Sequence, residues 1–410
     1  MNLVSSSDEI HFYKYHLKEF YIIFSDGSYK VDNNRLCDIT EMDAYLDNLY
    51  PILKVTVAFE PSIYYKLVKE KDTLKIKLNI QKYYRVNDKG DKSAYSKFIS
   101  DTFQLILNDD DENLSKDIHD KEFPDGDENE LNAITIKQEL FLFKKFVIKT
   151  NKTMINKVFE NMTPTGGLSY LLSRLGINNI LMDRLDNHTN YDFFYMPPLP
   201  INKEIKFIDT FYGFHRTGSV IFFGLSRSYI LRFSTKTNAF EKGEIKDVCF
   251  IVPKEGSSIT DSYAMLHKKN VKDKKYVLIN PSDFKPSNPD RSDSIISPEV
   301  VEIVSPTAGA LRQTGAAKTN KKVIVAKGVN PYYESIYDTY VTSGESEITV
   351  NAKDVDVSIF EPNKHYSFLF EDTSLAKKYK GKYFLCNKKI LLMRDGMDFT
   401  AEVELVLRKV

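Results

Sequence analysis

The stretch TLKIKLNIQ, residues 73–81, decides the fold class of this chain. Apolar residues occupy every second position from Leu74 to Ile80. The polar residues between and after them are Lys75, Lys77, Asn79 and Gln81. Because successive side chains of a β-strand point to opposite faces, this alternation predicts a strand with one buried face and one face in water.

Further strand signals surround this stretch. EFYIIFSDGSYKV (19–31) predicts a hairpin, because Asp26-Gly27 offers the positive φ angles of a tight turn between two aromatic and β-branched runs. ILKVTVAF (52–59), DTFQLILN (101–108) and ELFLFKKFVIK (139–149) predict further strands. Residues 1–150 are therefore expected to form a first, mostly antiparallel β-barrel or sandwich.

The end of the chain has the same character. EITV (347–350), DVSIF (356–360) and HYSFLFE (365–371) read as strands, and Asp395-Gly396 is expected to turn one long strand into another within 381–410. Residues 218–410 are therefore expected to form a second β-barrel.

The apolar period changes between these two parts. Leu168, Leu171, Leu172 and Leu175 recur at helical spacing, and Gly176 stands where a left-handed C-terminal cap is expected. Apolar residues from 154 to 162 show a similar spacing just upstream, which predicts helix there as well. Residues 151–217 are therefore expected to form a small helical or α/β insertion.

The segment FFYMPPLPINKEIKFIDTFYGFHRTGSVIFFG, residues 193–224, follows. Its prolines exclude a helix before about residue 202, and Gly213 is expected to end the helix that then begins. Gly218 is expected to form the bend before a strand buried between the two β domains, with alternating side chains on opposite faces. The residues expected to be structurally important are Gly213, Gly218, Val220, Phe222, Leu168 and Leu172.

His215, in the polar turn HRTG, is the one candidate for a general base. A general base needs an oriented carboxylate and a nucleophile or water nearby, and no such group stands at local spacing. The favoured interpretation is a structural turn with His215 at the surface. The sequence thus predicts no catalytic, cofactor-binding or metal-binding residue.

Composition limits the function classes. The 410 residues carry 57 Lys plus Arg and 57 Asp plus Glu, so no overall charge attracts the chain to nucleic acid or an anionic membrane. Cys37, Cys249 and Cys386 lie too far apart in sequence for a disulfide framework or a structural zinc site. The N-terminus lacks a signal-peptide pattern and no run reaches the roughly 18 apolar residues of a membrane span. We expect a soluble, unprocessed chain without nucleic-acid sequence recognition or stable membrane insertion.

Two long segments are polar. Residues 109–130 contain eleven acidic side chains, but with Gly126 at the sixth position of a calcium loop the first and third ligands would be Lys121 and Phe123. A solvated loop is favoured there. Residues 281–322 mix Pro, Ser, Gly and Ala, and their TGAAKTNKK lacks the glycine spacing of a phosphate-binding loop. A mobile excursion of the second β-barrel is expected.

The order of these parts resembles the baseplate hub proteins of contractile phage tails, whose fold is shared with the N-terminal part of type VI secretion spike proteins. The resemblance is carried by EFYIIF, by YPILKVTVAF leading into KDTLKIKLNIQKY, by the central block 166–224 and by the closing DFTAEVELVLRK. The central block, with its short helix, its PPL entry and its helix ending in YGF, is the most specific part.

The resemblance implies two tail-tube-like antiparallel β-barrels plus a small helical insertion in each chain. It also implies a homotrimer, so that three chains make a ring of six barrels that joins the six-fold tail tube to the three-fold central spike. The implied partners are the tail tube protein, the central spike protein and other baseplate proteins. The implied location is the baseplate of the virion, after assembly in the host cytoplasm. The family offers no catalytic residues or cofactors to carry over.

Two other functions stay open at this point. A cell-wall hydrolase of the tail tip would act through two carboxylates. A β-rich module could instead bind a carbohydrate or a receptor.

Overall fold

The fold is known from a computed structural model, which describes most of the chain. The described residues are 13–71, 73–84, 94–106, 136–177, 179–234, 237, 239–254, 265–267, 269, 271–286, 311–315, 322–326, 329–344, 347–353 and 355–410. The acidic segment 109–130 lies outside them, as do residues 287–310 and 316–321 of the expected excursion.

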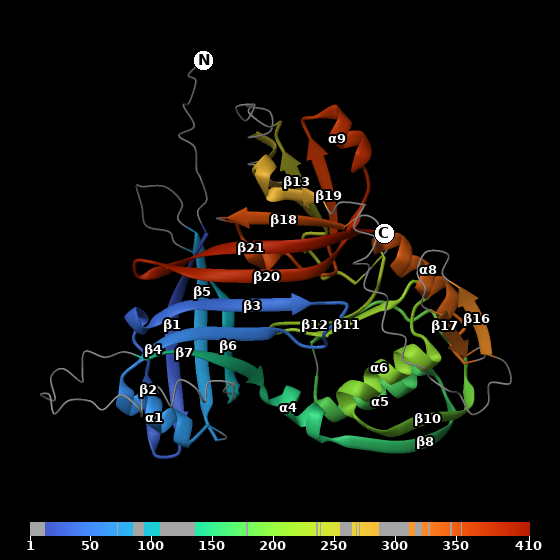
Figure 1. Ribbon diagram of the computed structural model, residues 1–410, viewed down its shortest axis with the longest axis horizontal. Helices are drawn as coiled ribbons and strands as arrows, with labels where there is room; N and C mark the ends of the chain where they lie inside the picture. Colours follow the sequence, from blue (N-terminus) through green and yellow to red (C-terminus); the bar gives the residue numbers. More distant parts are fainter. Residues whose placement is uncertain are drawn as a thin grey trace, which may run out of the picture.

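Eight antiparallel strands close into a barrel in the order β20-β3-β4-β7-β6-β5-β1-β21, and β21 pairs back to β20 (Figure 1). These strands are β1 (Tyr13–Phe24), β3 (Leu36–Ala44), β4 (Ile52–Phe59), β5 (Lys75–Tyr84), β6 (Ala94–Ile106), β7 (Ile136–Lys144), β20 (Tyr383–Asp395) and β21 (Asp398–Lys409). β2 (Gly27–Lys30) pairs with β1, the short η1 helix (Asn33–Arg35) precedes β3, and α1 (Pro61–Lys69) follows β4. The mainly β fold predicted from the sequence, with an antiparallel barrel, is confirmed.

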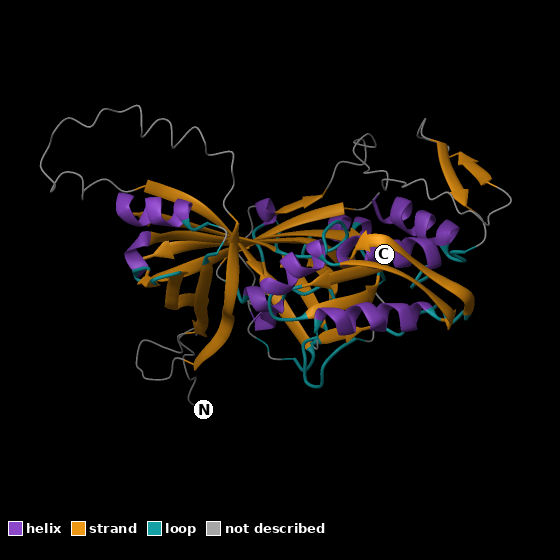
Figure 2. Cartoon of the chain, turned by 90° about the horizontal axis from the view of Figure 1, so that it is seen from below, coloured by secondary structure: helices purple, strands orange, loops and turns teal. Residues whose placement is uncertain are grey.

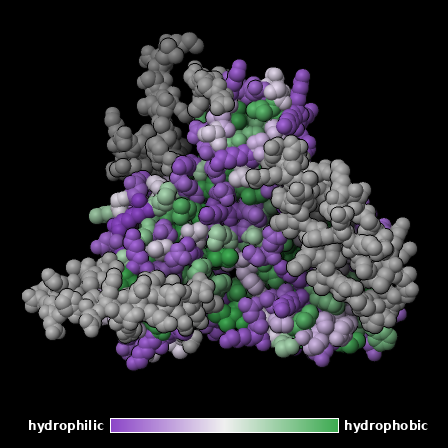
Figure 3. All heavy atoms as spheres, viewed as in Figure 1, coloured by the Kyte–Doolittle hydropathy of each residue, from purple (hydrophilic) through white to green (hydrophobic). Residues whose placement is uncertain are grey.

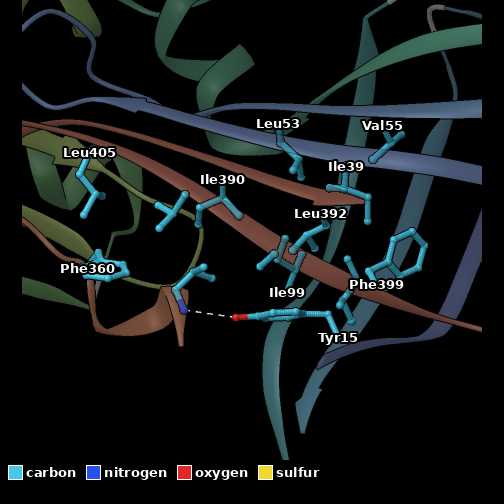
Figure 4. Close-up of a cluster of buried hydrophobic side chains, with 14 of the residues drawn as sticks. Tyr15, Ile39, Leu53, Val55, Ile99, Phe360, Ile390, Leu392, Phe399 and Leu405 are labelled. Carbon is cyan, nitrogen blue, oxygen red and sulfur yellow. Dashed lines mark hydrogen bonds between the residues drawn. The ribbon is translucent and has the colours of Figure 1, made fainter. Parts of the chain in front are cut away.

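Side chains fill the interior of this barrel, as expected for eight strands. Leu74, just before β5, and Ile76, Leu78 and Ile80 within it are buried, and Lys75 and Lys77 face solvent, as their alternation predicts. Figure 4 shows the same core from other strands, with Ile39, Val55, Ile99, Leu392 and Phe399 converging. The hydroxyl oxygen of Tyr15 accepts a hydrogen bond from the backbone N–H of Val357, at 3.2 Å, which ties the barrel to the second β unit (Figure 4).

The second β unit is an arc of seven strands in the order β14-β13-β19-β20-β21-β18-β15. Its further strands are β13 (Asp247–Val252), β14 (Lys274–Leu278), β15 (Phe284–Pro286), β18 (Glu347–Lys353) and β19 (His365–Phe370). The short helices beside it are η3 (Pro281–Asp283), η5 (Val357–Ile359) and α9 (Thr373–Lys378). Phe284 of β15 packs edge-on against the rings of Phe368 and Phe370 of β19, at 5.2 and 5.1 Å, so side chains fill this unit as well.

The second unit differs from the expected antiparallel barrel, because β13 pairs in parallel with both β14 and β19. Two parallel strands need a long crossover connection between them. Residues 253–273, between β13 and β14, are long enough for one. β20 and β21 belong to both units and cross the middle of the molecule in Figure 1. Strands from before residue 150 and from after residue 217 share one sheet, so the sheet itself does not divide the chain at these positions. The domain boundaries expected at residues 150 and 217 stay predictions.

A third module lies beside the two β units. It contains α4 (Lys145–Lys152), β8 (Met154–Met162), α5 (Pro164–Leu175), β9 (Ile180–Met182), β10 (Tyr191–Pro200), α6 (Ile201–Tyr212), β11 (Ser219–Phe223) and β12 (Ser228–Arg232). α8 (Tyr333–Gly344) and the separate pair β16 (Leu311–Gly315) and β17 (Lys322–Ala326) complete the described elements. Seen from below, most of the helices lie in the middle and in the half of the molecule that carries the C-terminus (Figure 2).

Several local predictions hold here. Gly176 ends α5 at φ 68°, as predicted, and the structure adds that Thr163 caps its start by accepting the Gly166 N–H at 3.2 Å. Extended β10 runs through its prolines to Pro200, where α6 begins.

Other local predictions are wrong. Residues 154–162 form strand β8 and not a helix, because they pair with β10 and bury only Ile155 fully. The strand predicted for 139–149 ends at Lys144 and continues as α4. Residues 356–360 contain the short helix η5, where Asp356 accepts the Ser358 N–H, in place of a strand. The hairpin at 19–31 does form, but its turn residues are Ser25-Asp26 and Gly27 has no positive φ.

Two hydrophobic cores meet at the sheet formed by β9, β12 and β11. Val220 and Phe222 of β11 belong to the core of the β units. Ile221 and Phe223 belong to the core around α5 and α6. The predicted alternation of faces is confirmed, but one face meets the helical module and not a second β domain.

Candidate functional site

Three loops converge where the β9-β12-β11 sheet ends. They follow β9, connect α6 to β11, and follow β12. Backbone bonds hold them together: Asp183 N–H to Ile230 O at 2.9 Å, Asp186 N–H to Phe214 O at 2.9 Å, and Phe233 N–H to Gly218 O at 2.9 Å. Polar residues that are far apart in sequence are therefore fixed beside the turn HRTG.

Two glycines shape this turn. Gly213 ends α6 at φ 77°, and a Cβ there would lie 2.2 Å from the Asn330 side-chain oxygen. Asn330 in turn donates to the carbonyl of Thr210 at 2.8 Å, so the segment before α8 packs against the end of α6. Gly218 adopts φ 92° at the bend before β11. Both glycines thus occupy the positions predicted for them.

Asp186 organises the site. One of its carboxylate oxygens accepts the Arg216 backbone N–H at 3.0 Å, and the other accepts Arg232 Nη2 at 2.7 Å. The neighbouring Asp183 accepts the Arg232 backbone N–H at 3.0 Å and the Thr237 hydroxyl at 3.1 Å. The two carboxylates therefore fix the backbone and one guanidinium group, and both are engaged as acceptors.

His215 is completely buried, so the expectation of a surface position is wrong. Its Nδ1 lies 3.8 Å from a carboxylate oxygen of Asp186, and neither ring nitrogen has a hydrogen-bond partner among the described residues. Burial lowers the pKa of His215 to about 4, against the opposing effect of Asp186. The imidazole is therefore neutral near pH 7.

A hollow of about 470 Å³ opens beside this cluster, within the size range of small-ligand sites. We call it the arginine hollow. It is lined by Arg184, Leu185, Asp186, His188, Arg216, Thr217, Arg232 and Ser234. Three arginines and one aspartate thus line a common space.

Of the six residues predicted to be structurally important, the structure brings only some to this site. Gly213 and Gly218 shape the turn, whereas Val220 and Phe222 are buried in β11. Leu168 is buried in α5 and Leu172 is partly buried against the same core. Sequence reasoning did not connect the four charged residues of the hollow. Arg184 and Asp186 stand in a charged run after β9, Arg216 in the turn HRTG, and Arg232 at the end of β12, and no sequence pattern links these places.

The hollow suits binding of an anion better than catalysis. Arginine forks match carboxylate and phosphate oxygens. Among the described residues, His, Cys, Asp and Glu side chains form no group of three or more that could hold a metal ion. Within the same described ranges, no helix combines the length and apolar character needed to cross a bilayer.

Similar solved structures include two tail proteins. The 43 kDa tail protein of prophage MuSo2 from Shewanella oneidensis is 9% identical, with 94% of this chain and 96% of that chain covered at a TM-score of 0.42. The tail protein from Neisseria meningitidis MC58 is also 9% identical, with 96% of each chain covered at a TM-score of 0.42.

A third similar structure is the E. coli c3393 protein, described as a component of the type VI secretion system with structural similarity to T4 bacteriophage tail proteins gp27 and gp5. It is 5% identical, with 92% of this chain and 74% of that chain covered at a TM-score of 0.40. No curated protein sequence matches this chain.

One family model matches almost the whole chain. It describes the Bacteriophage PBS1 gene 109 protein and matches residues 12–410, which include both β units, the helical module and the arginine hollow. The resemblance to phage proteins that the sequence suggested is thereby confirmed, and the chain belongs to the Bacteriophage PBS1 gene 109 protein family.

Proposed function

We propose that this protein is a structural subunit of a phage tail baseplate, and that three copies form a ring joining the six-fold tail tube to the three-fold central spike. The observation that carries the proposal is the fusion of two β units in one chain through β20 and β21. Three such chains place six β units around one axis, which suits a boundary between six-fold and three-fold assemblies. The proposed partners are the tube protein, the spike protein and other baseplate proteins. Assembly is proposed to take place in the host cytoplasm.

The ribbon formed by β8 and β10 offers a surface for self-association. Val158 lies opposite Tyr195 and Phe193 lies opposite Glu160 in its register. Phe193 is 72% exposed and Val158 is 59% exposed, and Met154 and Tyr195 are exposed as well. Figure 3 shows hydrophobic residues among hydrophilic ones along the lower edge, where β8 and β10 lie in Figure 1. Clustered exposed apolar side chains of this kind are typical of protein interfaces.

Analytical ultracentrifugation of the full chain tests this proposal. We expect the wild type to sediment as a trimer, and the double variant Val158→Asp with Phe193→Asp to sediment as a monomer, because two buried carboxylates would oppose the contact. Met397→Asp is the matched control, since Met397 is 81% exposed but lies in the turn between β20 and β21. A wild type that stays monomeric both alone and within the assembled particle would contradict the proposal.

We propose that the chain has no hydrolase activity. A two-carboxylate mechanism needs one acid that can donate a proton and one free carboxylate. The paired acids of the site, Asp183 and Asp186, instead accept hydrogen bonds from Arg232 and the backbone. A turbidity assay on purified cell walls should show no clearing, and clearing that is lost in Asp186→Asn would overturn this part.

A further inference from the structure

We infer that the arginine hollow binds a carboxylate-rich segment of a protein partner. The inference does not depend on trimer formation, because every residue that lines the hollow comes from one chain. It rests on three observations: the charges of the lining residues, the buried polar atoms around them, and the way in which the arginines are held.

The charges of the hollow are unbalanced. Arg232 is paired with Asp186, with 2.7 Å between Nη2 and a carboxylate oxygen. Arg184 and Arg216 have no carboxylate partner among the described residues, although Lys plus Arg and Asp plus Glu balance over the whole chain. Two of the arginines that line the hollow therefore have no counter-charge from the described part of the chain.

Buried polar atoms beside the hollow have unfilled hydrogen-bonding capacity. They are the Nε of Arg232, the hydroxyl of Thr217 and both ring nitrogens of the fully buried His215, none of which has a partner among the described residues. Buried polar atoms are rarely left without partners in native proteins. Arg232 and Thr217 are residues of the hollow's wall, so this unfilled hydrogen-bonding capacity lies next to the space that a ligand would occupy.

Arg216 and Arg232 are held in place before any ligand arrives. The Arg216 guanidinium lies 5.6 Å above the ring of Tyr332, its backbone N–H is bound by Asp186, and its carbonyl accepts the Ser335 hydroxyl at 2.6 Å. The fork of Arg232 is fixed by Asp186. Pre-ordered donors lose less entropy on binding, which favours specific recognition of carboxylates.

The concave shape favours side chains of a protein over a nucleic acid. A space of about 470 Å³ with Leu185 in its wall can take a few acidic side chains and their apolar stems. A nucleic-acid backbone is better matched by an extended basic groove with aromatic residues for stacking.

Fluorescence anisotropy with a fluorescein-labelled hexa-aspartate peptide tests the inference. We expect salt-sensitive binding to the wild type, and at least tenfold weaker binding to the double variant Arg184→Gln with Arg216→Gln. Arg394→Gln is the matched control, because Arg394 is exposed on β20 away from the hollow, and its affinity should stay within about twofold of the wild type. Unchanged melting temperatures would show that the variants fold.

Four results would overturn the inference. The first is no binding of hexa-aspartate at about 50 mM salt, where exposed charges are weakly screened. The second is equal affinity for the wild type and the double variant. The third is tighter binding of hexathymidylate than of hexa-aspartate, which would assign the hollow to nucleic acid. The fourth is binding of a hexa-asparagine peptide, which would show that charge does not drive recognition.

Discussion

His215 illustrates how a single residue can be misjudged from its neighbours in sequence. It stands in a polar turn of glycines and charged residues, which predicts exposure. The turn is instead covered by the loops after β9 and β12, and the side chain is fully buried. Burial depends on segments more than 15 residues away in sequence, so local composition could not reveal it. The same holds for Asp186 and Arg232, whose pairing across 46 positions has no sequence signature.

The burial of His215 predicts a specific dependence of stability on pH. Its pKa is lowered from the usual 6.5 to about 4, so below pH 6.5 the unfolded chain takes up a proton that the folded chain does not. This group therefore lowers the free energy of unfolding as the pH falls from about 6.5 to 4, by about 2 kcal/mol between pH 7 and pH 5.

Urea unfolding of the wild type and of His215→Leu, at pH 7 and at pH 5, measures this contribution. The comparison with the variant is needed because buried carboxyl groups have the opposite effect on stability. Burial raises the pKa of Glu204 to about 8, for example, so this group raises the free energy of unfolding as the pH falls. We expect the wild type to lose about 2 kcal/mol more than His215→Leu on going to pH 5. Equal losses would show that His215 is accessible to protons in the folded state.

At the scale of elements, the predictions that held rest on local chemistry. Period-2 alternation predicted β5, and a glycine at the left-handed cap position predicted the end of α5. The predictions that failed depended on a partner strand. Residues 154–162 have helical spacing, yet their pairing with β10 makes them a strand. Cross-strand pairing outweighs a weak helical pattern that would bury little apolar surface.

The glycines that end α5 and α6 allow a matched test of a tertiary contact. Gly176 and Gly213 both have positive φ, at 68° and 77°, but ψ is 30° at Gly176 and 126° at Gly213, so alanine also meets more backbone strain at Gly213. A Cβ at Gly176 would meet no atom within 4 Å, whereas one at Gly213 would lie 2.2 Å from Asn330. Gly176→Ala should therefore cost only the backbone strain of about 1 kcal/mol, and Gly213→Ala should cost about 2 kcal/mol more.

Thermal melting of both variants checks this expectation, and the background Asn330→Ala shows its cause. Removing the Asn330 side chain should relieve part of the cost of Gly213→Ala and none of the cost of Gly176→Ala. If both alanine variants melt at the same temperature, the contact between α6 and the segment before α8 does not constrain the helix end.

At the scale of the whole molecule, the sequence predicted two β-rich parts around an insertion but not how they join. Alternating apolar residues show that a segment is a strand without naming its neighbour in the sheet. β20 and β21 were expected to pair within the second part, and they also complete the first barrel against β3 and β1. The arginine hollow was unpredictable for the same reason, since it is built from three separate loops.

The pairing of β6 with β7 bears on the acidic segment. Ile106 lies opposite Phe141 in the antiparallel register, so a short link can connect the two strands. We expect replacement of residues 111–128 by a Gly-Ser link to preserve soluble expression and the melting temperature within a few degrees, because shortening a long loop changes closure entropy only slightly. Loss of soluble expression, measured beside the wild type, would indicate that these acidic residues take part in folding.

The shared hairpin of β20 and β21 also sets the order in which the chain can fold during synthesis. The barrel strands β1 and β3 to β7 leave the ribosome early, but the two strands that close the barrel are made about 240 residues after β7. At about 5–20 residues per second, the unpaired edges of β1 and β3 wait for roughly 10 to 50 seconds. During that time the nascent barrel exposes strand edges that can pair with neighbouring chains. Yield in the host should therefore depend on chaperones that act on the growing chain.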